Sequence, residues 1–562
     1  MRTYGIALLF VLGALLLFTF HLGDMSLWDN DEAKYTQIAR EMATSGEILT
    51  LTYDGRPWFV HPPLAFWLQA FTGRLFGFTE FTARIWPAIF GAIGVGVTYL
   101  FGRVLFSERI GLWSAVILAT MFQYFAQSRL VVFDTILVVF MLASLYSFYQ
   151  GYARSPSPAR SSEAGPSIPG ENPLPSSPWT GDSETRRSYL WGFAWAGLAT
   201  LTKGPVGLLL PAMTFLAFLG IRRELSKLRQ IPVLLGLGLY LLIGGTWYVV
   251  EAIRHGYPFI ARVIGYYTFY RFLGPVEGQS GPFYYYVPVL LLGAFPWTGF
   301  LYSMATYHAR RLDQDSSLLL ILWCAIVFIF YSIAGTKLPN YILPLYPLCA
   351  MGIASTWEAF LQNPQDHRRK MAVGALVNFL ATFVVFTEVA LFARWKYPVE
   401  LVHLRESLLL LSTVLFLGLL LATVAFFAHR ERWSLLLIPA TMVVAMIVLV
   451  TALLPQVEAM RPIRPLARRI QAEVLGGNPV VALMPEIPSL RYYLNHPVEW
   501  ITDPGRFLES ICRGERKVVI VRGGLESELE KVLKGSEVIA REGSFVAFRI
   551  DVPMRSWCSS SP

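Results

Sequence analysis

Charged residues are scarce in this chain and cysteines are few. Asp, Glu, Lys and Arg make up 15% of the 562 residues, whereas a soluble domain carries about a quarter. This composition excludes a soluble enzyme, a disordered chain and a nucleic-acid binder, although the formal net charge is +9. The four cysteines have no metal-ligand spacing and make no disulfide framework. We therefore expect neither a cysteine-based metal centre nor a disulfide scaffold.

Apolar residues are abundant instead, at 54% of the chain. A helix that crosses a bilayer needs about 17–25 mostly apolar residues. Thirteen apolar runs are predicted to cross the bilayer: 5–22 (an uncleaved anchor), 82–102, 110–127, 131–150, 189–201, 205–220, 231–250, 283–303, 317–335, 339–357, 371–392, 407–428 and 434–454. A further apolar run, 62–77, opens with Pro62-Pro63 and contains Arg74, so we predict an interfacial or re-entrant helix there.

Basic residues gather in alternate loops between these spans. With the N-terminus inside, every cytoplasmic connection carries Lys or Arg, as the positive-inside rule requires. A full span at 62–77 would move all of these clusters outside, so the charges argue against it. The clusters are Arg103 and Arg109; Arg222, Arg223, Lys227 and Arg229; Arg310 and Arg311; Arg368, Arg369 and Lys370; and Arg430 and Arg432.

Three segments lie outside the predicted spans. Residues 23–81 form an external loop, called here the first loop. Residues 152–188 are rich in Ser, Pro and Gly and predict a cytoplasmic linker. Residues 455–562 follow the transmembrane domain (1–454) and predict a small external α/β domain. Its predicted strands are 480–484, 517–521 and 544–550, and its predicted helices are 463–475, 506–512 and 525–533.

Ionisable side chains gather at the external loops and span ends. Such groups at membrane depth are costly and by default indicate function. In the first loop, Asp31 and Glu32 begin a predicted helix, and Tyr35, Arg56 and His61 follow among aromatic and Pro/Gly residues. For any single acid an ordinary helix start is the simpler interpretation. The density of the whole loop favours a shaped site.

A second group of charges lies at the external ends of later spans. Asp134 enters an apolar helix, where a helix N-cap is an equally good interpretation. Lys203 and Lys337 lie at turns, where each could instead extend to the membrane interface. With Arg271 they place three cations on the same face as Asp31 and Asp134.

These motifs together resemble a known family. They are Asp31-Glu32-x-x-Tyr35, an Asp between spans three and four, Thr-Lys-Gly-Pro at 202–205, and Lys-Leu-Pro-x-Tyr-Ile-Leu-Pro-Leu-Tyr-Pro at 337–347. The pattern is similar to the bacterial protein-mannosyltransferase-like (GT-C) glycosyltransferases, and most resembles the lipid A aminoarabinose transferase branch. The resemblance implies a polytopic α-helical GT-C fold of about 13 transmembrane helices with a small C-terminal α/β periplasmic domain. It also implies a bacterial inner-membrane protein whose site faces the periplasm.

Members of this family transfer a sugar from a polyprenyl phosphate to a lipid or protein acceptor. The resemblance therefore implies an inverting transfer from an undecaprenyl-phosphate-type donor to a lipid A-like acceptor. Transfer to protein Ser/Thr or to another envelope glycan is the alternative. A secondary transporter is disfavoured because the charges gather at one face and no internal repeat is visible. We expect a monomer in contact with membrane lipids but not with nucleic acid. We expect no required cofactor, and the sequence does not support a divalent metal site.

The resemblance also suggests roles for individual residues. Asp31 and Asp134 match the two family acids and are expected to be catalytic. Cations stabilise the negative charge that develops on the lipid phosphate as it leaves. A hydroxyl acceptor needs a base such as Asp31 to take its proton. His61 stands where related chains commonly have lysine, and we expect it to contact phosphate in its protonated form. The residues expected to bind substrate are Glu32, Tyr35, Arg56, His61, Lys203, Arg271, Lys337 and Tyr341.

Overall fold

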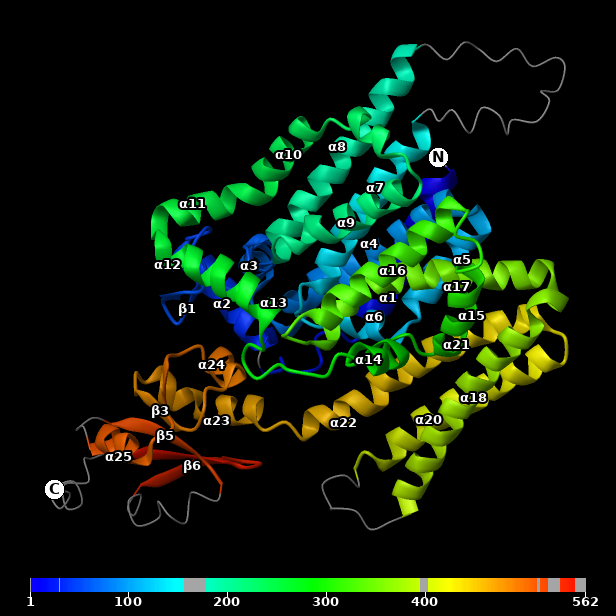
Figure 1. Cartoon of the computed structure of the whole chain (residues 1–562). Helices are drawn as coiled ribbons and strands as arrows, with labels where there is room; N and C mark the ends of the chain where they lie inside the picture. Colours follow the sequence, from blue (N-terminus) through cyan, green and yellow to red (C-terminus); the bar gives the residue numbers. More distant parts are fainter. Residues whose placement is uncertain are drawn as a thin grey trace, which may run out of the picture.

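Helices form the body of the molecule, and a small sheet lies at its C-terminal end (Figure 1). The computed structural model describes residues 2–29, 31–155, 178–394, 403–512, 516–523 and 536–550. Ten of the thirteen expected apolar runs each fall mainly on a single helix. These helices are α1 (Arg2–Thr19), α4 (Glu80–Leu105), α7 (Asp134–Arg154), α8 (Pro178–Lys203), α9 (Val206–Ile221), α16 (Asp315–Ile333), α17 (Leu345–Gln362), α18 (Pro364–Arg394), α20 (Arg405–Phe427) and α21 (Glu431–Val448).

The other three runs fall on interrupted helices. The first is α5 (Glu108–Ala119) with α6 (Phe122–Gln127), and the second is α10 (Val233–Tyr240), η2 (Leu241–Gly245) and α11 (Thr246–His255). In the third, α14 (Tyr286–Gly293) meets η4 (Thr298–Phe300) and α15 (Leu301–His308) at an angle of 117°. Shorter connecting segments are η1 (Leu225–Gln230), α12 (Tyr257–Ile260), η3 (Ala261–Tyr270), α13 (Arg271–Leu273), η5 (Pro339–Ile342) and η6 (Leu449–Leu453).

The chain is a multi-pass membrane protein by the length and apolarity of these helices. Within the described residues, seven helices are long and apolar enough to cross a bilayer, or eight if the bent α14–α15 pair is one span. Two shorter apolar helices, Thr3–Thr19 and Val206–Ile221, add to these. Thirteen crossings therefore remain a prediction. On α18 and α20 apolar side chains such as Leu380 and Leu417 are exposed, as expected of helices that face lipid.

Close helix packing around α4 depends on small residues. Thr79 caps α4 through a reciprocal hydrogen-bonded pair with Thr82. A Cβ atom at Gly94 would lie 2.0 Å from the Tyr124 hydroxyl oxygen. This position therefore needs glycine to let α6 approach α4, the small-residue packing common between membrane helices.

The first loop folds into α2 (Asp31–Ser45), the hairpin of β1 (Thr52–Tyr53) and β2 (Arg56–Pro57), and α3 (Leu64–Phe76). Helix α3 corresponds to the segment predicted as interfacial or re-entrant. Its 13 residues extend about 20 Å, which is too short to cross a bilayer of about 30 Å.

The predicted linker at 152–188 is shorter than expected. Helix α7 continues to Arg154, and α8 already begins at Pro178. Residues 156–177, the remainder of the predicted linker, lie outside the described part of the chain.

The C-terminal domain is a mixed sheet with helices on both faces, in agreement with the predicted α/β domain. The strand order is β4-β3-β5-β7-β6, with β3 parallel to β4 and β5, and β7 antiparallel to β5 and β6. The elements are α22 (Leu454–Ala459), α23 (Ile463–Leu475), β3 (Val480–Leu483), α24 (Pro488–Leu494), β4 (Val498–Ile501), α25 (Pro504–Cys512), β5 (Lys517–Arg522), β6 (Glu537–Glu542) and β7 (Phe545–Ile550).

Alternate residues of the central strands serve two separate cores. Val480 and Ala482 pack with α23, whereas Val481 and Leu483 pack with α25. Because both faces are covered, β3 is apolar throughout, as sheet strands between helices usually are. The predicted boundary at 454 falls within a helix, since α21, η6 and α22 are continuous from Glu431 to Ala459. The predicted helix at 525–533 lies among residues that the structure does not describe.

Candidate active site

Residues of the first loop help to line two adjoining cavities. One is polar, with a volume of about 260 Å³, and the other is mainly apolar, with a volume of about 340 Å³. Leu137, Leu209 and Phe330 are among the side chains that line the apolar cavity. The two cavities form one continuous site because they share lining residues. The shared residues include His61, Asp134, Lys203, Arg271 and Tyr341.

A buried ion pair lies where the two cavities meet. The Lys203 ammonium donates to both carboxylate oxygens of Asp134, at 2.7 and 2.6 Å. The Asn340 amide donates to the same carboxylate at 2.6 Å. Asp134 is the first residue of α7, whose N-cap is Phe133, so the N-cap interpretation of Asp134 is wrong. Its carboxylate instead orients a lysine and an asparagine from two other elements.

The Thr-Lys-Gly-Pro motif explains how Lys203 comes to this position. Helix α8 ends at Lys203, and Gly204 has a φ of +109°, a conformation that residues with a Cβ rarely adopt. Pro205 is the N-cap of α9, which begins at Val206. The tight reversal presents Lys203 at the end of two antiparallel helices. Its ammonium also lies 5.3 Å from the centre of the Tyr341 ring, which the Arg271 guanidinium approaches to 6.0 Å.

Asp31 lines the polar cavity from the first turn of α2. Burial raises the pKa of its carboxyl above the ordinary value, and the Lys203 ammonium and a hydrogen bond from Tyr35 oppose that rise. The Tyr35 ring stacks on Phe133, with centroids 4.8 Å apart. Helix α2 is therefore fixed against the segment that leads into α7.

His61 is buried beside these groups, with its Nε2 atom 3.1 Å from the Tyr35 hydroxyl. Burial, together with the positive charges of Lys203 and Arg271, lowers the pKa of His61 well below its ordinary value. Burial and these two cations disfavour the protonated form of His61 in the cavity without a ligand. The expected contact of protonated His61 with phosphate stays a prediction.

Arg271 presents an unused donor to the cavity. Its Nη2 atom donates to the Gln279 side chain at 3.2 Å. Its Nε atom is buried and has no hydrogen-bond partner among the described residues. A buried N–H group without an acceptor is costly. A bound anion at this place would supply the missing acceptor.

Three residues expected to bind substrate lie elsewhere. Arg56 is exposed on β2, and neither cavity includes it in its lining. The Lys337 ammonium donates to the Ser332 and Ala334 carbonyls at 2.8 and 2.7 Å. It therefore satisfies carbonyl groups at the C-terminal end of α16.

Glu32, the third of these residues, is buried against the Arg84 guanidinium. Arg84 donates to both of its carboxylate oxygens, at 2.9 and 2.7 Å. Glu32 also accepts from the Val131 backbone at 2.7 Å. It therefore connects α2 to α4 and to the segment before Asp134, which fixes the first loop instead of facing the cavity.

Other lining residues were not identified from the sequence. Asn340 occupies the variable position in Lys-Leu-Pro-x-Tyr. Its place next to Tyr341 in this motif is the feature of the sequence that could have identified it. Glu277 and Gln279 line the polar cavity from a loop without a recognisable motif. Lys34 and Arg262 also line this cavity; the sequence places both among the charged residues at external loops and span ends, but without a predicted role.

The C-terminal domain holds the segment that precedes Asp31. The Tyr493 hydroxyl accepts from the Leu27 backbone at 2.7 Å, and the Ser489 backbone donates to the Asp29 carboxylate at 3.1 Å. Arg461 donates to the Leu27 carbonyl at 2.8 Å. Helix α24 accordingly lies beside α2 (Figure 1). Two distant parts of the chain therefore define the position of the Asp31 backbone.

No group of three or more His, Cys, Asp or Glu side chains is arranged to hold a metal ion in the described ranges.

Comparison with known proteins gives consistent matches. A profile of the dolichyl-phosphate-mannose-protein mannosyltransferase family matches residues 5–164. An uncharacterized protein of Aquifex aeolicus is 26% identical over 98% of this chain and 93% of its own length. An undecaprenyl phosphate-alpha-4-amino-4-deoxy-L-arabinose arabinosyl transferase of Proteus mirabilis is 26% identical over 62% of this chain and 58% of its own length.

Among solved structures, the chain is similar to ArnT from Cupriavidus metallidurans, crystallised with undecaprenyl phosphate. The TM-score is 0.78 at 22% identity, over 97% of this chain and 98% of that one. The chain is a glycosyltransferase with the GT-C fold. The predicted resemblance to the protein-mannosyltransferase-like superfamily, close to the aminoarabinose transferase branch, is confirmed.

Proposed function

We propose that the enzyme transfers a sugar from a polyprenyl (undecaprenyl) phosphate donor to a lipid A-like acceptor, with inversion. The reaction would take place at the periplasmic face of the bacterial inner membrane. The observation that supports this most strongly is the junction of a cationic cavity with an apolar one. A polyprenyl phosphate sugar has the same two-part character. Four cationic side chains line the polar part: Lys34, Lys203, Arg262 and Arg271.

In this proposal Lys203 and Arg271 receive the donor phosphate. Both side chains line the polar and the apolar cavity, so they lie where the phosphate joins the isoprenoid. The phosphate leaves as an anion when the sugar is displaced, and fixed cations at short range stabilise that developing charge. The unpaired Nε atom of Arg271 supports this role. The four cations provide this stabilisation, so we propose that no cofactor is required.

Asp31 is the group that faces the acceptor in this proposal. An acceptor hydroxyl loses its proton to Asp31, because a carboxylate with a raised pKa is the better base. With a phosphate acceptor, which is already anionic, Asp31 would orient the acceptor and stabilise positive charge on the sugar. Direct attack opposite the leaving phosphate inverts the anomeric centre.

Asp134 and His61 support these two groups. Asp134 is engaged by Lys203 and Asn340, so we assign it to positioning the cation instead of to proton transfer. His61 and Tyr35 contact each other in the wall of the cavity beside Asp31. All of these groups come from a single chain, so the proposed site is complete in a monomer.

The test is transfer by the purified protein. The protein is incubated with radiolabelled polyprenyl phosphate sugars and an inner-membrane extract, and mass spectrometry identifies the molecule that gains mass. Labelled lipid would support the proposal, whereas the absence of any transferred sugar would contradict it. Labelled protein would favour the second candidate, transfer to Ser/Thr, which the match to a protein mannosyltransferase profile supports.

The orientation needs a separate measurement. Cysteines introduced at positions 31 and 203 in a variant without native cysteines are treated with a membrane-impermeant thiol reagent in spheroplasts. We expect both to react in intact spheroplasts. Reaction only after membrane lysis would place the site on the cytoplasmic side.

A further inference from the structure

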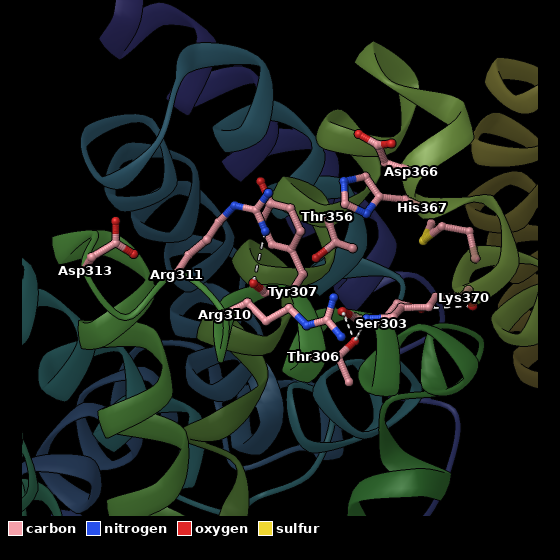
Figure 2. A pocket seen from close by; sticks show the side chains of 11 residues that line it. Ser303, Thr306, Tyr307, Arg310, Arg311, Asp313, Thr356, Asp366, His367 and Lys370 are labelled. Carbon is pink, nitrogen blue, oxygen red and sulfur yellow. Dashed lines mark hydrogen bonds between the residues drawn. The ribbon is translucent and has the colours of Figure 1, made fainter.

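A third cavity, called here the basic cavity, has a volume of about 480 Å³. Figure 2 shows its lining, which comes from the end of α15, the loop after it, α17 and the start of α18. Arg310, Arg311 and Lys370 bring three cationic side chains to this cavity, from two separate segments of the chain. None of these side chains belongs to the site below the first loop.

The basic cavity lies at the opposite end of the helix bundle from the proposed active site. Helix α16 begins at Asp315, next to the loop that lines the basic cavity, and ends at Ile333. Ala334 already lines the apolar cavity of the active site. The 19 residues of α16 span about 28 Å, close to the thickness of a bilayer core. The two sites are therefore one membrane thickness apart.

Two of the three cations, Arg311 and Lys370, are held in place without being neutralised. Lys370 donates to the Thr306 hydroxyl at 3.0 Å. Arg311 donates to the Tyr307 carbonyl at 3.3 Å, and its guanidinium lies 3.9 Å from the centre of the Tyr307 ring. In the described part of the chain, neither these side chains nor Arg310 form an ion pair. Three like charges around one hollow favour an anionic ligand.

Two carboxylates also line the basic cavity, but they do not cancel this charge. Asp313 and Asp366 are both exposed. Neither forms an ion pair with a described residue, and two carboxylates beside three cations leave the lining with a net positive charge. Figure 2 shows both at the edge of the group of side chains, with the guanidinium of Arg310 and the ammonium of Lys370 nearer its middle.

An apolar surface begins one turn beyond the cations. Val373, Leu376, Val377 and Leu380 of α18 are all exposed, at 44%, 42%, 43% and 54%. Their spacing of three and four residues places them on one face of the helix. Lys370 precedes Val373 by three residues and Val377 by seven, so it lies on the same face. A ligand with an anionic head and apolar chains matches this order of charge and apolar surface.

We propose that the basic cavity binds the phosphate headgroup of an anionic membrane phospholipid, with its acyl chains along the exposed face of α18. Basic hollows between transmembrane helices at a membrane surface are suited to such headgroups. Arginine in addition offers paired N–H groups that match phosphate oxygens. The site is separate from the transfer reaction, so the proposal stands independently of the proposed function.

The experiment compares lipid retention by the full-length protein. Delipidated protein in neutral detergent is offered phosphatidylglycerol or phosphatidylcholine, and native mass spectrometry counts the lipids bound at each concentration. We expect phosphatidylglycerol to bind at least about tenfold more tightly, because phosphatidylcholine carries beside its phosphate a choline cation that the basic side chains repel. Equal retention of the two lipids would refute the proposal.

Variants locate the site. Arg310→Gln combined with Lys370→Gln is expected to abolish the preference for phosphatidylglycerol. Arg310→Gln alone, at an exposed position without an ion pair, is expected to reduce it severalfold with no change in folding. Arg369→Gln is the matched control, because Arg369 is exposed on the same helix but does not line the cavity. Full retention by the double variant, or equal loss in the control, would exclude the basic cavity as the site.

Soluble headgroups distinguish a lipid from a free phosphate compound. Glycerol 3-phosphate carries the charge but has no acyl chains, so we expect it to displace phosphatidylglycerol only at concentrations at least about a hundredfold higher. Displacement at equal concentration would show that the cavity takes a soluble phosphate and would overturn the assignment to a lipid.

Discussion

Replacement of Asp134 by asparagine is expected to impair transfer through Lys203. The carboxylate receives two hydrogen bonds from the Lys203 ammonium at 2.7 and 2.6 Å. A hydrogen bond to a charged group contributes about 1.5–3 kcal/mol. If Asp134 acts by holding Lys203 on the donor phosphate, Asp134→Asn should lower kcat/KM for the donor by roughly ten- to 150-fold.

A double-mutant cycle tests this argument. Lys203→Met removes the phosphate contact itself, so adding Asp134→Asn to it should cost little more. The expected coupling energy is thus about as large as the effect of Asp134→Asn alone. The measurement is the initial rate of radiolabelled sugar transfer at low donor concentration for the wild type, both single variants and the double variant. Additive losses would refute the reasoning, because they would show that Asp134 acts independently of Lys203.

The thermal stability of the same variants gives a second measurement of the interaction between Asp134 and Lys203. Asp134→Asn leaves a largely buried ammonium without its counter-charge, which costs about 3–5 kcal/mol in comparable pairs. The Tm of the single variant should therefore fall, and the double variant should recover part of that loss. Arg56→Gln is the control, because Arg56 is exposed and lies outside both cavities. It should leave kcat/KM within about twofold of the wild type.

Further predictions concern single residues. Asp31→Asn should lower kcat by about 10²- to 10⁴-fold in the transfer assay with the Tm maintained; full activity would remove Asp31 from the chemistry. Since burial raises the pKa of Asp31, the wild-type rate should rise with pH through a midpoint above the ordinary aspartate value. The free energy of unfolding should fall over the same interval as the buried acid ionises, and a variant lacking this carboxyl should show no such fall. Lys337→Met should lower the Tm but leave KM for the donor unchanged, because the ammonium binds helix carbonyls; a large rise in KM would return Lys337 to the phosphate site. Tyr493→Phe leaves the Leu27 N–H group without its acceptor, at a cost of about 1–3 kcal/mol, and limited proteolysis of the first loop should become faster; an unchanged cleavage rate would contradict this.

The sequence predicts most helices and the central strands of the sheet, but misses the strands at its edges. Strands β3, β5 and β7 lie inside the sheet, and each contains four consecutive apolar residues, so they stand out from their surroundings. Strands β4 and β6 are the two edges and carry charged residues such as Glu499 and Arg541. Natural sheets commonly place charge on edge strands, which removes the apolar run by which a strand is recognised.

The sequence predicts a set of mostly charged site residues, but only some of them lie together in the fold. Asp31, Asp134, Lys203, Arg271 and Tyr341 line the polar cavity. Other predicted site residues pair with side chains or backbone groups elsewhere in the fold, and the sequence does not reveal these pairings. For Glu32 this partner is 52 residues away, on α4. Such pairings form only in the folded chain, so spacing along the sequence cannot separate them from groups that face a substrate.

The contact between the first loop and the C-terminal domain has a consequence for biosynthesis. Leu27 meets Arg461 and Tyr493, which follow it by 434 and 466 residues. At a translation rate of about 5–20 residues per second, these partners are made roughly 20–90 s after Leu27. The nascent chain therefore completes most of its membrane insertion while the loop bearing Asp31 lacks this anchor. Completion of the first-loop contacts beside the candidate site therefore waits for segments made 434 and 466 residues after Leu27.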